Sequence, residues 1–350
     1  MQTLPITRCR TDGFAGYALA WSPFFPGRLA LASSQNFGLV GNGRLHLLGY
    51  QPQTRQLGVE KAFDTQDGLY DLAWSETHEN QIVSASGDGS IKLWDIALND
   101  FPIRNWHEHQ REVFSVDWNN LDKSTFASSS WDHTIKLWRP ELPHSLQTIP
   151  AHSACVYAAL FSPSQPQTLA SVSSDGFLKV WDLNSPTAAS GNASLAIPAH
   201  PTEILSLDWN KYQPFLVATG SVDRTVKIHD IRKASSAMST PTAMPGQACV
   251  ETLLGHDYAI RKVAWSPHSA TLLASASYDM SARIWNAQSP GTIGQPPQLQ
   301  WSGKSAQSTN LRKVHTAHTE FVVGLAWSLY EDGLIASCSW DTETHLWPVR

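Results

Sequence analysis

Histidine and aspartate recur at one fixed separation along this chain of 350 residues. Both residue types can transfer protons or bind metal ions, so their regular pairing needs an explanation. Five histidines each precede an aspartate by 23 positions: His109 and Asp132, His152 and Asp175, His200 and Asp223, His256 and Asp279, His318 and Asp341. The pattern indicates either repeated chemical sites or a repeated structural unit.

Aromatic residues keep the same spacing and favour the structural unit. Six aspartates, the five above and Asp88, are followed after six positions by Trp94, Trp138, Trp181, His229, Trp285 and Trp347. Fourteen positions before the same aspartates stand Trp74, Trp118, Phe161, Trp209, Trp265 and Trp327. A repeat of this length predicts a solenoid or a propeller. Aspartates spread one per unit around a ring do not converge as an acid and a base.

Each unit is predicted to consist of β-strands. Short runs with alternating β-branched residues, such as VFSVDW and TIKLW, are separated by polar turns, and no segment has a clear helical period. The aspartates advance by 44, 43, 48, 56 and 62 residues. The added length lies in segments rich in Ser, Pro and Gly, which we interpret as surface loops at 185–197, 233–250 and 287–313.

These units resemble the WD40 repeat family, in which each unit supplies a propeller blade of four strands. The resemblance implies that the histidine, the aspartate, the tryptophan of the later strand and a Ser or Thr form one hydrogen-bonded network in each blade. Such pairing offsets the cost of burying polar groups. The Ser or Thr positions are Ser84, Ser128, Ser171, Thr219, Ser275 and Ser337.

A seventh unit is needed at the N-terminus, where Trp21 takes the place of the earlier tryptophan but Gln35 replaces the aspartate. The expected fold is all-β: a single seven-bladed WD40 β-propeller over residues 1–350, with its ring closed by an N-terminal strand at 2–9. Closure removes the exposed edge of a sheet. The expected blades span roughly 12–56, 63–99, 107–143, 150–185, 198–233, 254–289 and 316–350.

Composition narrows the function. The net charge of −5 and the pI near 6.3 argue against a nucleic-acid partner. The four cysteines form no CxxC pair, so neither a zinc site nor a disulfide framework is predicted, and a reducing compartment such as the cytosol fits. No apolar run predicts a secretory signal or a membrane span. The motifs GxSxG, HExxH and GxxxxGK[ST] do not occur, so we expect no enzyme, no metal and no cofactor.

A propeller without catalytic residues binds partners through its faces, and the repeat spacing locates one face. In each unit, one aromatic residue stands fourteen positions before the aspartate, such as Trp74 before Asp88. The residues six and four positions before that aromatic residue, and the residue just before the aspartate, are expected at the upper rim. Exposed aromatic clusters near charges mark binding sites, although single rings could instead fold down and plug the central channel. The predicted site consists of Tyr17, Asp67, Tyr70, Glu112, Phe114, Trp131, Tyr157, Glu203, Leu205, Tyr278 and Trp340. An apolar track with carboxylates suits an amphipathic helix that carries a basic residue among leucines.

Several stretches also resemble the receptor family for the type 2 peroxisomal targeting signal. They are GYALAWSPFFPGRLALASSQNFGLVGNGRL (16–45), FDTQDGLYDLAWSE (63–76), PAHPTEILSLDWNKY (198–212) and LLGHDYAIRKVAWSP (253–267). The resemblance implies a cytosolic import receptor that shuttles to the peroxisome. Its cargo would be thiolase-like matrix proteins with an N-terminal helical signal of the pattern Arg/Lys-Leu-five residues-His/Gln-Leu. A peroxisomal co-receptor and docking proteins are the other implied partners.

On this resemblance, the arginine of the signal is expected near Asp67 and Glu112. Its leucines are expected against Tyr70, Phe114, Trp131 and Tyr157. The alternative function is a substrate adaptor of a cullin ubiquitin ligase, another use of WD40 propellers. The WDxR motif of those adaptors is matched only in part, by HDIR at 229–232.

Overall fold

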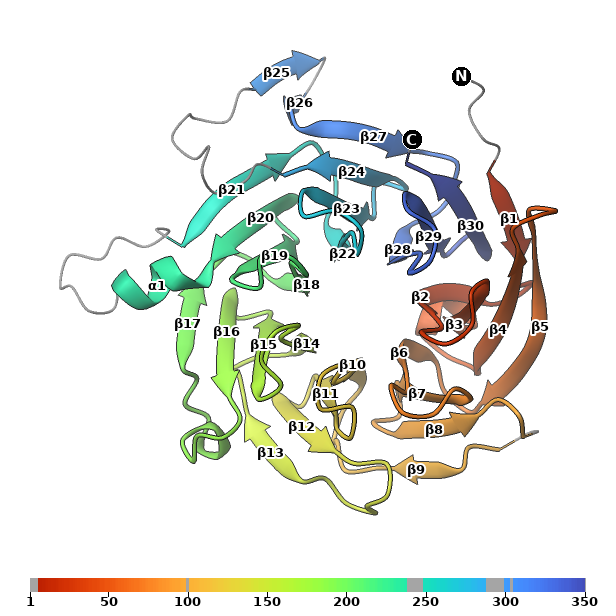
Figure 1. Ribbon diagram of the computed structural model, residues 1–350, viewed down its shortest axis with the longest axis horizontal. Helices are drawn as coiled ribbons and strands as arrows, with labels where there is room; N and C mark the ends of the chain where they lie inside the picture. The colour runs from red at the N-terminus through yellow and green to blue at the C-terminus, as the bar shows by residue number, and fades with distance from the viewer. Residues whose placement is uncertain (1–5, 99–100, 238–247, 288–298, 303–304, 350) are drawn as a thin grey trace.

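Seven sheets of four strands each stand around a central axis (Figure 1). The computed structural model describes residues 6–98, 101–237, 248–287, 299–302 and 305–349. Within each sheet neighbouring strands pair antiparallel, so that the first strand of a blade faces the axis and the last lies on the perimeter. The structure confirms the predicted all-β, seven-bladed propeller.

The strands are short, and those nearest the axis are largely buried. Blades 1 and 2 contain β2 (Ala15–Trp21), β3 (Arg28–Ser34), β4 (Gly43–Gln51), β5 (Gln56–Thr65), β6 (Leu69–Trp74), β7 (Gln81–Ser86), β8 (Ile91–Asp95) and β9 (Arg104–Trp106). Blades 3 and 4 contain β10 (Val113–Trp118), β11 (Phe126–Ser130), β12 (Thr134–Trp138), β13 (Gln147–Pro150), β14 (Val156–Phe161), β15 (Thr168–Ser173), β16 (Phe177–Asp182) and β17 (Leu195–Pro198). Blades 5 and 6 contain β18 (Ile204–Trp209), β19 (Leu216–Ser221), β20 (Thr225–Asp230), β21 (Cys249–Leu254), β22 (Ile260–Trp265), β23 (Leu272–Ser277), β24 (Ala282–Asn286) and β27 (Leu311–His315).

Blade 7 is built from both ends of the chain and closes the ring. It contains β28 (Val322–Trp327), β29 (Leu334–Ser339) and β30 (Glu343–Pro348), with β1 (Thr7–Arg10) as its outer strand. Arg8 lies opposite His345 in this pairing, and β1 and β30 are seen side by side in Figure 1. The predicted closure by an N-terminal strand is confirmed, while residues 2–5 of the predicted strand lie outside the described residues.

All three segments interpreted as loops overlap regular structure that the sequence did not predict. Helix α1 (Ile231–Ala237) follows Asp230, whose Oδ1 accepts the backbone N–H of Arg232 at 3.1 Å. This capping bond stabilises the N-terminal end of the short helix. A hairpin of β25 (Leu299–Ser302) and β26 (Ser305–Ser308) lies within the loop at 287–313. The short 3-10 turns are η1 (Asn36–Gly38) and η2 (Ala188–Ser190). Residues 238–247, 288–298 and 303–304 of these loops lie outside the described residues.

A buried hydrogen-bonded network holds each of blades 3 to 7 together. In blade 3, His109 Nδ1 lies 2.8 Å from Asp132 Oδ2 and His109 Nε2 lies 2.7 Å from Ser128 Oγ. The indole N–H of Trp138 donates to the same Ser128 oxygen at 2.8 Å. Since Nδ1 faces a carboxylate, it carries the proton and Nε2 accepts from the hydroxyl. Equivalent bonds recur in the next four blades, with His229 in place of the tryptophan in blade 5.

The carboxylates of this network are held in their charged form. Burial tends to raise the pKa of Asp132, but the hydrogen bonds from His109, Thr134 and the backbone N–H of Gln110 bring that pKa below the usual range of aspartate. The same balance lowers the pKa of Asp341 to about 2. In blade 3 every polar atom of the network is therefore paired, which favours one defined packing of the blade.

Removing the shared hydroxyl tests how much the network stabilises a blade. Ser128→Ala leaves both the Trp138 N–H and His109 Nε2 without their partner, so we expect a loss of about 1–3 kcal/mol in the free energy of unfolding. Urea titration followed by tryptophan fluorescence measures it. Ser190→Ala, at an exposed serine of η2, is the matched control and should change stability by less than about 0.5 kcal/mol. Equal effects of the two substitutions would contradict the role of the network.

A second histidine cluster lies where blade 6 meets blade 7. His315 Nε2 lies 3.1 Å from His345 Nδ1, and His345 Nε2 lies 2.8 Å from Glu343. Burial, and then the charge of neighbouring His318, lower the pKa of His315 to about 3 and that of His345 to about 4. Both rings are therefore neutral in the folded protein at neutral pH.

Acid should destabilise this junction. Because the folded pKa values lie below the unfolded value of about 6.5, stability is complete above pH 6.5 and falls as the pH drops toward 4. Between pH 6.5 and 5 each histidine contributes a loss of up to about 2 kcal/mol. The double substitution His315→Ile and His345→Lys copies Ile149 and Lys179, the equivalent pair between blades 3 and 4, and should reduce that loss. The measurement is the unfolding midpoint of the wild type and the double variant at pH 7 and at pH 5. An equal change between the two pH values in both proteins would contradict the role given to His315 and His345.

Candidate functional site

One residue from each blade meets at one end of the central channel. These seven residues, named here the mouth ring, are Tyr17, Tyr70, Phe114, Tyr157, Leu205, Arg261 and Val323. All stand four positions before the inner-strand aromatic residue, so the repeat spacing located them correctly in space. The cavity that they line has a volume of about 20 Å³, which is room for about one water molecule. The mouth ring therefore seals the channel.

The mouth ring divides into buried and partly exposed members. Tyr17 is 8% exposed, Leu205 6% and Val323 2%, so these three mainly close the channel, as the plugging alternative anticipated for single residues. Tyr70, Phe114, Tyr157 and Arg261 remain partly exposed. A ligand on this face would therefore meet blades 2, 3, 4 and 6 first.

The aromatic residues of this face form one continuous set of ring contacts. We define the aromatic arc as Tyr157, Trp131, Phe114, Tyr70, Tyr17, Trp340, Phe321 and Tyr278. Phe114 is its centre, since it stacks on Trp131 and on Tyr70 with ring centroids 4.7 Å apart in both cases. The structure thus brings together all the predicted aromatic residues, and adds Phe321, whose ring lies 5.2 Å from that of Trp340.

Carboxylates flank the arc on both sides of Phe114. Burial raises the pKa of Tyr70, and the charges of Asp67 and Glu112 raise it further, which places both carboxylates around that ring. Glu112 lies 3.6 Å from the exposed Arg111, a surface pair that stabilises little and can be exchanged for another cation. On the other side, the Tyr157 hydroxyl donates to Glu203 at 3.0 Å. The face therefore presents an apolar surface with negative charge at its edge.

A loop of blade 1 extends the arc and was not predicted as part of the site. Tyr17 donates its hydroxyl to Phe37 O at 2.6 Å, and Tyr70 donates to Gly38 O at 3.2 Å. Phe37 adopts a left-handed φ of 57°, which is strained for an aromatic residue, and its ring lies 5.4 Å from Trp340. Beyond it, Leu39 is 84% exposed and Val40 75%. The feature of the sequence that could have indicated this loop is the apolar pair Leu39 and Val40 inside a turn rich in Gly and Asn.

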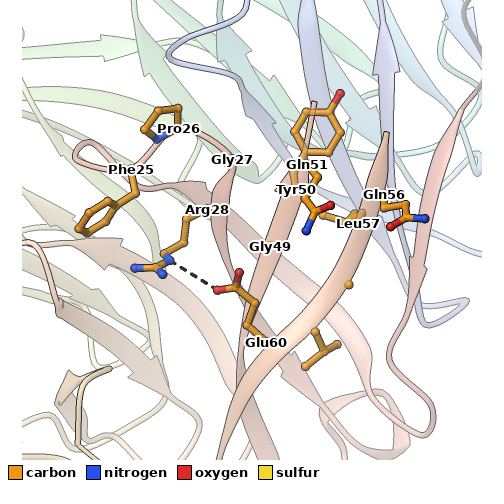
Figure 2. A pocket seen from close by; sticks show the side chains of 12 residues that line it. Phe25, Pro26, Gly27, Arg28, Gly49, Tyr50, Gln51, Gln56, Leu57 and Glu60 are labelled. Atoms are coloured by element: carbon orange, nitrogen blue, oxygen red, sulfur yellow. Dashed lines mark ion pairs between the residues drawn. The ribbon is translucent and has the colours of Figure 1, made fainter. Parts of the chain in front are cut away.

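A larger groove lies at the other end of blade 1 (Figure 2). It has a volume of about 580 Å³ and is lined by the β2–β3 turn and by β4 and β5. Its two charges, Arg28 and Glu60, form an ion pair of 3.6 Å, and Arg28 also covers the Phe25 ring. A Cβ atom at Gly49 would meet the Glu60 carboxyl group, the flexible end of a side chain. The charged groups of this groove are satisfied by one another.

Buried carboxylates below the mouth ring have a structural role. Asp71, Asp117 and Asp208 each accept a backbone N–H from the innermost strand of the next blade, at 3.2, 2.7 and 2.7 Å. Burial raises the pKa of Asp117 to about 7, against the hydrogen bond from Phe161. They line a cavity of about 340 Å³ with Lys211 and Lys262. These bonds fix the distance between neighbouring blades and so the position of the mouth ring.

Three buried histidines lie close enough together to suggest a metal site. One ring nitrogen each of His315, His318 and His345 lie within 4.8 Å of one another. His318, however, uses both nitrogens, on Asp341 and on Ser337. Its ring also stacks on that of His345 at 3.8 Å and 10°, so their in-plane lone pairs run parallel and do not converge on one point. Hydrogen bonding accounts for the cluster.

Comparison with known proteins identifies the family. The family model described as "WD domain, G-beta repeat" matches residues 59–95, 101–139, 143–182, 192–230, 247–286 and 309–348. The chain is 38% identical to the "Peroxisomal targeting signal 2 receptor" of Saccharomyces cerevisiae over 97% of this chain and 98% of the relative. It is 39% identical to the mouse protein of the same name, over 95% of this chain and 93% of the relative. The chain belongs to the family of peroxisomal targeting signal 2 receptors.

Membership of this family agrees with the stretches that carried the resemblance in the sequence. A plant relative, "Peroxisome biogenesis protein 7" of Arabidopsis thaliana, is 41% identical over 95% of both chains. The matched WD ranges begin at residue 59, so β2, β3 and β4 of blade 1, with Gln35 in the aspartate place, lie outside them. The names of these relatives describe targeting receptors and a biogenesis protein, and none describes an enzyme. Among the described residues, no helix is long and apolar enough to cross a membrane.

The two tyrosine hydroxyls should hold the blade 1 loop in place. The double substitution Tyr17→Phe and Tyr70→Phe removes both bonds to the loop and keeps the rings of the arc. We therefore expect faster hydrogen–deuterium exchange at the amides of Gly38 and Leu39, which bond only within the loop. Tyr212→Phe removes a hydroxyl bond to Pro267 elsewhere and is the control. Unchanged exchange in the double variant would show that the loop is held by other contacts.

Proposed function

We propose that this chain is a cytosolic import receptor that binds the N-terminal helical type 2 targeting signal of peroxisomal matrix proteins. The observation that carries the proposal is the aromatic arc with carboxylates at its edge, in a chain that belongs to this receptor family. Apolar rings supply most of the affinity in such interfaces, while charges set orientation and association rate. The role is binding without catalysis, and no cofactor or metal takes part.

The signal helix lies across the arc in this proposal. Its basic residue pairs with Asp67 and Glu112, displacing Arg111 from Glu112. Its leucines pack against Phe114 and the rings on either side of it. Support comes from the partial exposure of Tyr70, Phe114, Trp131 and Tyr157, which leaves room for contact without unfolding the arc. Glu203 and the buried Leu205 complete the predicted contact set at blade 5, and Tyr278 and Trp340 complete it at blades 6 and 7.

A co-receptor and docking proteins at the peroxisome complete the proposed cycle, in which the receptor shuttles between the cytoplasm and the organelle. A thiolase-like matrix protein is the expected cargo. The exposed Leu39 and Val40 beside the arc agree with a binding face larger than one short helix. The alternative role as a substrate adaptor of a cullin ubiquitin ligase is not favoured, because the relatives over nearly the full chain are named as targeting signal receptors.

Charge reversal at the edge of the arc tests the proposal. Glu112→Lys should weaken binding of a fluorescent signal nonapeptide, carried in a longer helix, by about thirtyfold or more, because a cation then faces the basic residue of the signal. Phe114→Ala should cost a similar factor through lost apolar contact. Fluorescence anisotropy titrations, with and without the co-receptor, measure both.

Glu141→Lys makes the same charge change at an exposed position of the β12–β13 loop and should leave the affinity unchanged. Thermal unfolding followed by circular dichroism checks that each variant is folded. Wild-type affinity in folded Glu112→Lys protein would sink the proposed site. Absence of signal binding by the wild-type protein, even with the co-receptor, would sink the proposed function.

A further inference from the structure

Arg261 is the one charged member of the mouth ring. The other six positions hold Tyr, Phe, Leu or Val. Because the ring leaves a cavity of only about 20 Å³ and its other members are aromatic or aliphatic, an apolar residue would fill this place at lower cost. A cation here therefore needs a reason beyond the fold.

The guanidinium group of Arg261 reaches across the channel mouth. Its central carbon lies 5.7 Å from the centre of the Phe114 ring, which belongs to blade 3, although Arg261 itself belongs to blade 6. One nitrogen lies 3.5 Å from the carbonyl oxygen of Leu205, a long and weak hydrogen bond. The cation thus lies at the middle of the aromatic arc, against its central ring.

Among the described residues, no carboxylate forms an ion pair with Arg261. The nearby acids have other partners: Glu203 accepts the Tyr157 hydroxyl, and Glu112 faces Arg111. Asp71, below the ring, accepts the backbone N–H of Val116. A guanidinium group has five N–H donors, so most of those of Arg261 are available to a ligand.

This face carries charges of both signs at different places. The carboxylates of Asp67 and Glu112 lie beside the Tyr70 ring, while the guanidinium group of Arg261 lies between the Phe114 ring and the Leu205 carbonyl of blade 5. A bound helix has matching polarity, since its N-terminal end is partly positive and the last four carbonyl groups at its C-terminal end lack partners. A nine-residue helix is about 14 Å long.

We propose that Arg261 is a specificity-determining residue that fixes the direction of the bound signal helix. It donates to oxygen acceptors in the last turn of the helix, carbonyl groups or an acidic side chain, while the N-terminal end lies at Asp67 and Glu112. The inference rests on the proposed function and adds to it a preference within the five unspecified positions of the signal. An acidic residue at the seventh position, in the last turn, is favoured over a basic one.

Two signal peptides that differ only at the seventh position, glutamate or lysine, test the proposal. Wild-type protein should bind the glutamate peptide about tenfold more tightly than the lysine peptide in anisotropy titrations. Arg261→Gln should remove this preference, and Arg261→Glu should reverse it. Arg224→Glu makes the same charge change at an exposed turn of blade 5 outside the mouth ring, and should keep the wild-type preference.

The outcomes separate the inference from the proposed function. If both Arg261 variants are folded by circular dichroism and keep the wild-type ratio of affinities, Arg261 does not face the ligand and the inference is wrong. If the wild-type protein binds the two peptides equally well, the preference does not exist and the inference is likewise wrong. If neither peptide binds the wild-type protein with the co-receptor present, the proposed function itself fails. A reversal by Arg261→Glu alone supports the inference, because a purely structural role would weaken both peptides equally.

Discussion

The hydroxyl group shared by a histidine and an indole in blades 3, 4, 6 and 7 is the interaction on which the rest of this structure depends. In blade 3, Ser128 donates to His109 and accepts from Trp138, and both partners are buried. Because every atom is paired, the turn aspartate, the loop before the blade and the third strand are held in one arrangement. Repetition of that arrangement makes the blades equivalent, and equivalence lets seven separate positions meet at one channel mouth.

The site follows from this equivalence with no special local structure. Innermost strands are held to one another by carboxylates such as Asp71, which accept a backbone N–H from the next blade. Side chains at the start of those strands then point toward the axis. The fold does not require particular residues there, because the core is already filled. Aromatic residues in these positions stack on one another, with Phe114 between Trp131 and Tyr70, and present a rigid surface at low entropic cost. Such a surface is suited to binding a peptide helix.

Spacing predicted the repeat and the convergence of the aromatic residues, and the resemblance to the WD40 family favoured a propeller over a solenoid and led to its predicted closure by the N-terminal strand. Spacing could not predict which rings would be buried, because strand alternation fixes the face of a side chain and not its rotamer. Tyr17 and Leu205 close the channel for this reason. Nor could it show that Tyr17 and Tyr70 hold the blade 1 loop, or that Arg261 reaches Phe114, since these contacts join residues far apart in the sequence. Helix α1 was missed because it is only seven residues long.

Site-specific cross-linking tests the central claim most directly, because it reports the place of contact and does not depend on a change in affinity. A signal peptide with a photoreactive leucine analogue at its second position would be irradiated with the full chain and the adducts located by mass spectrometry. The account predicts adducts on the arc, within residues 112–131 and at Tyr157. Adducts confined to the groove between β2, β4 and β5, or to the outer strands of the blades, would contradict it.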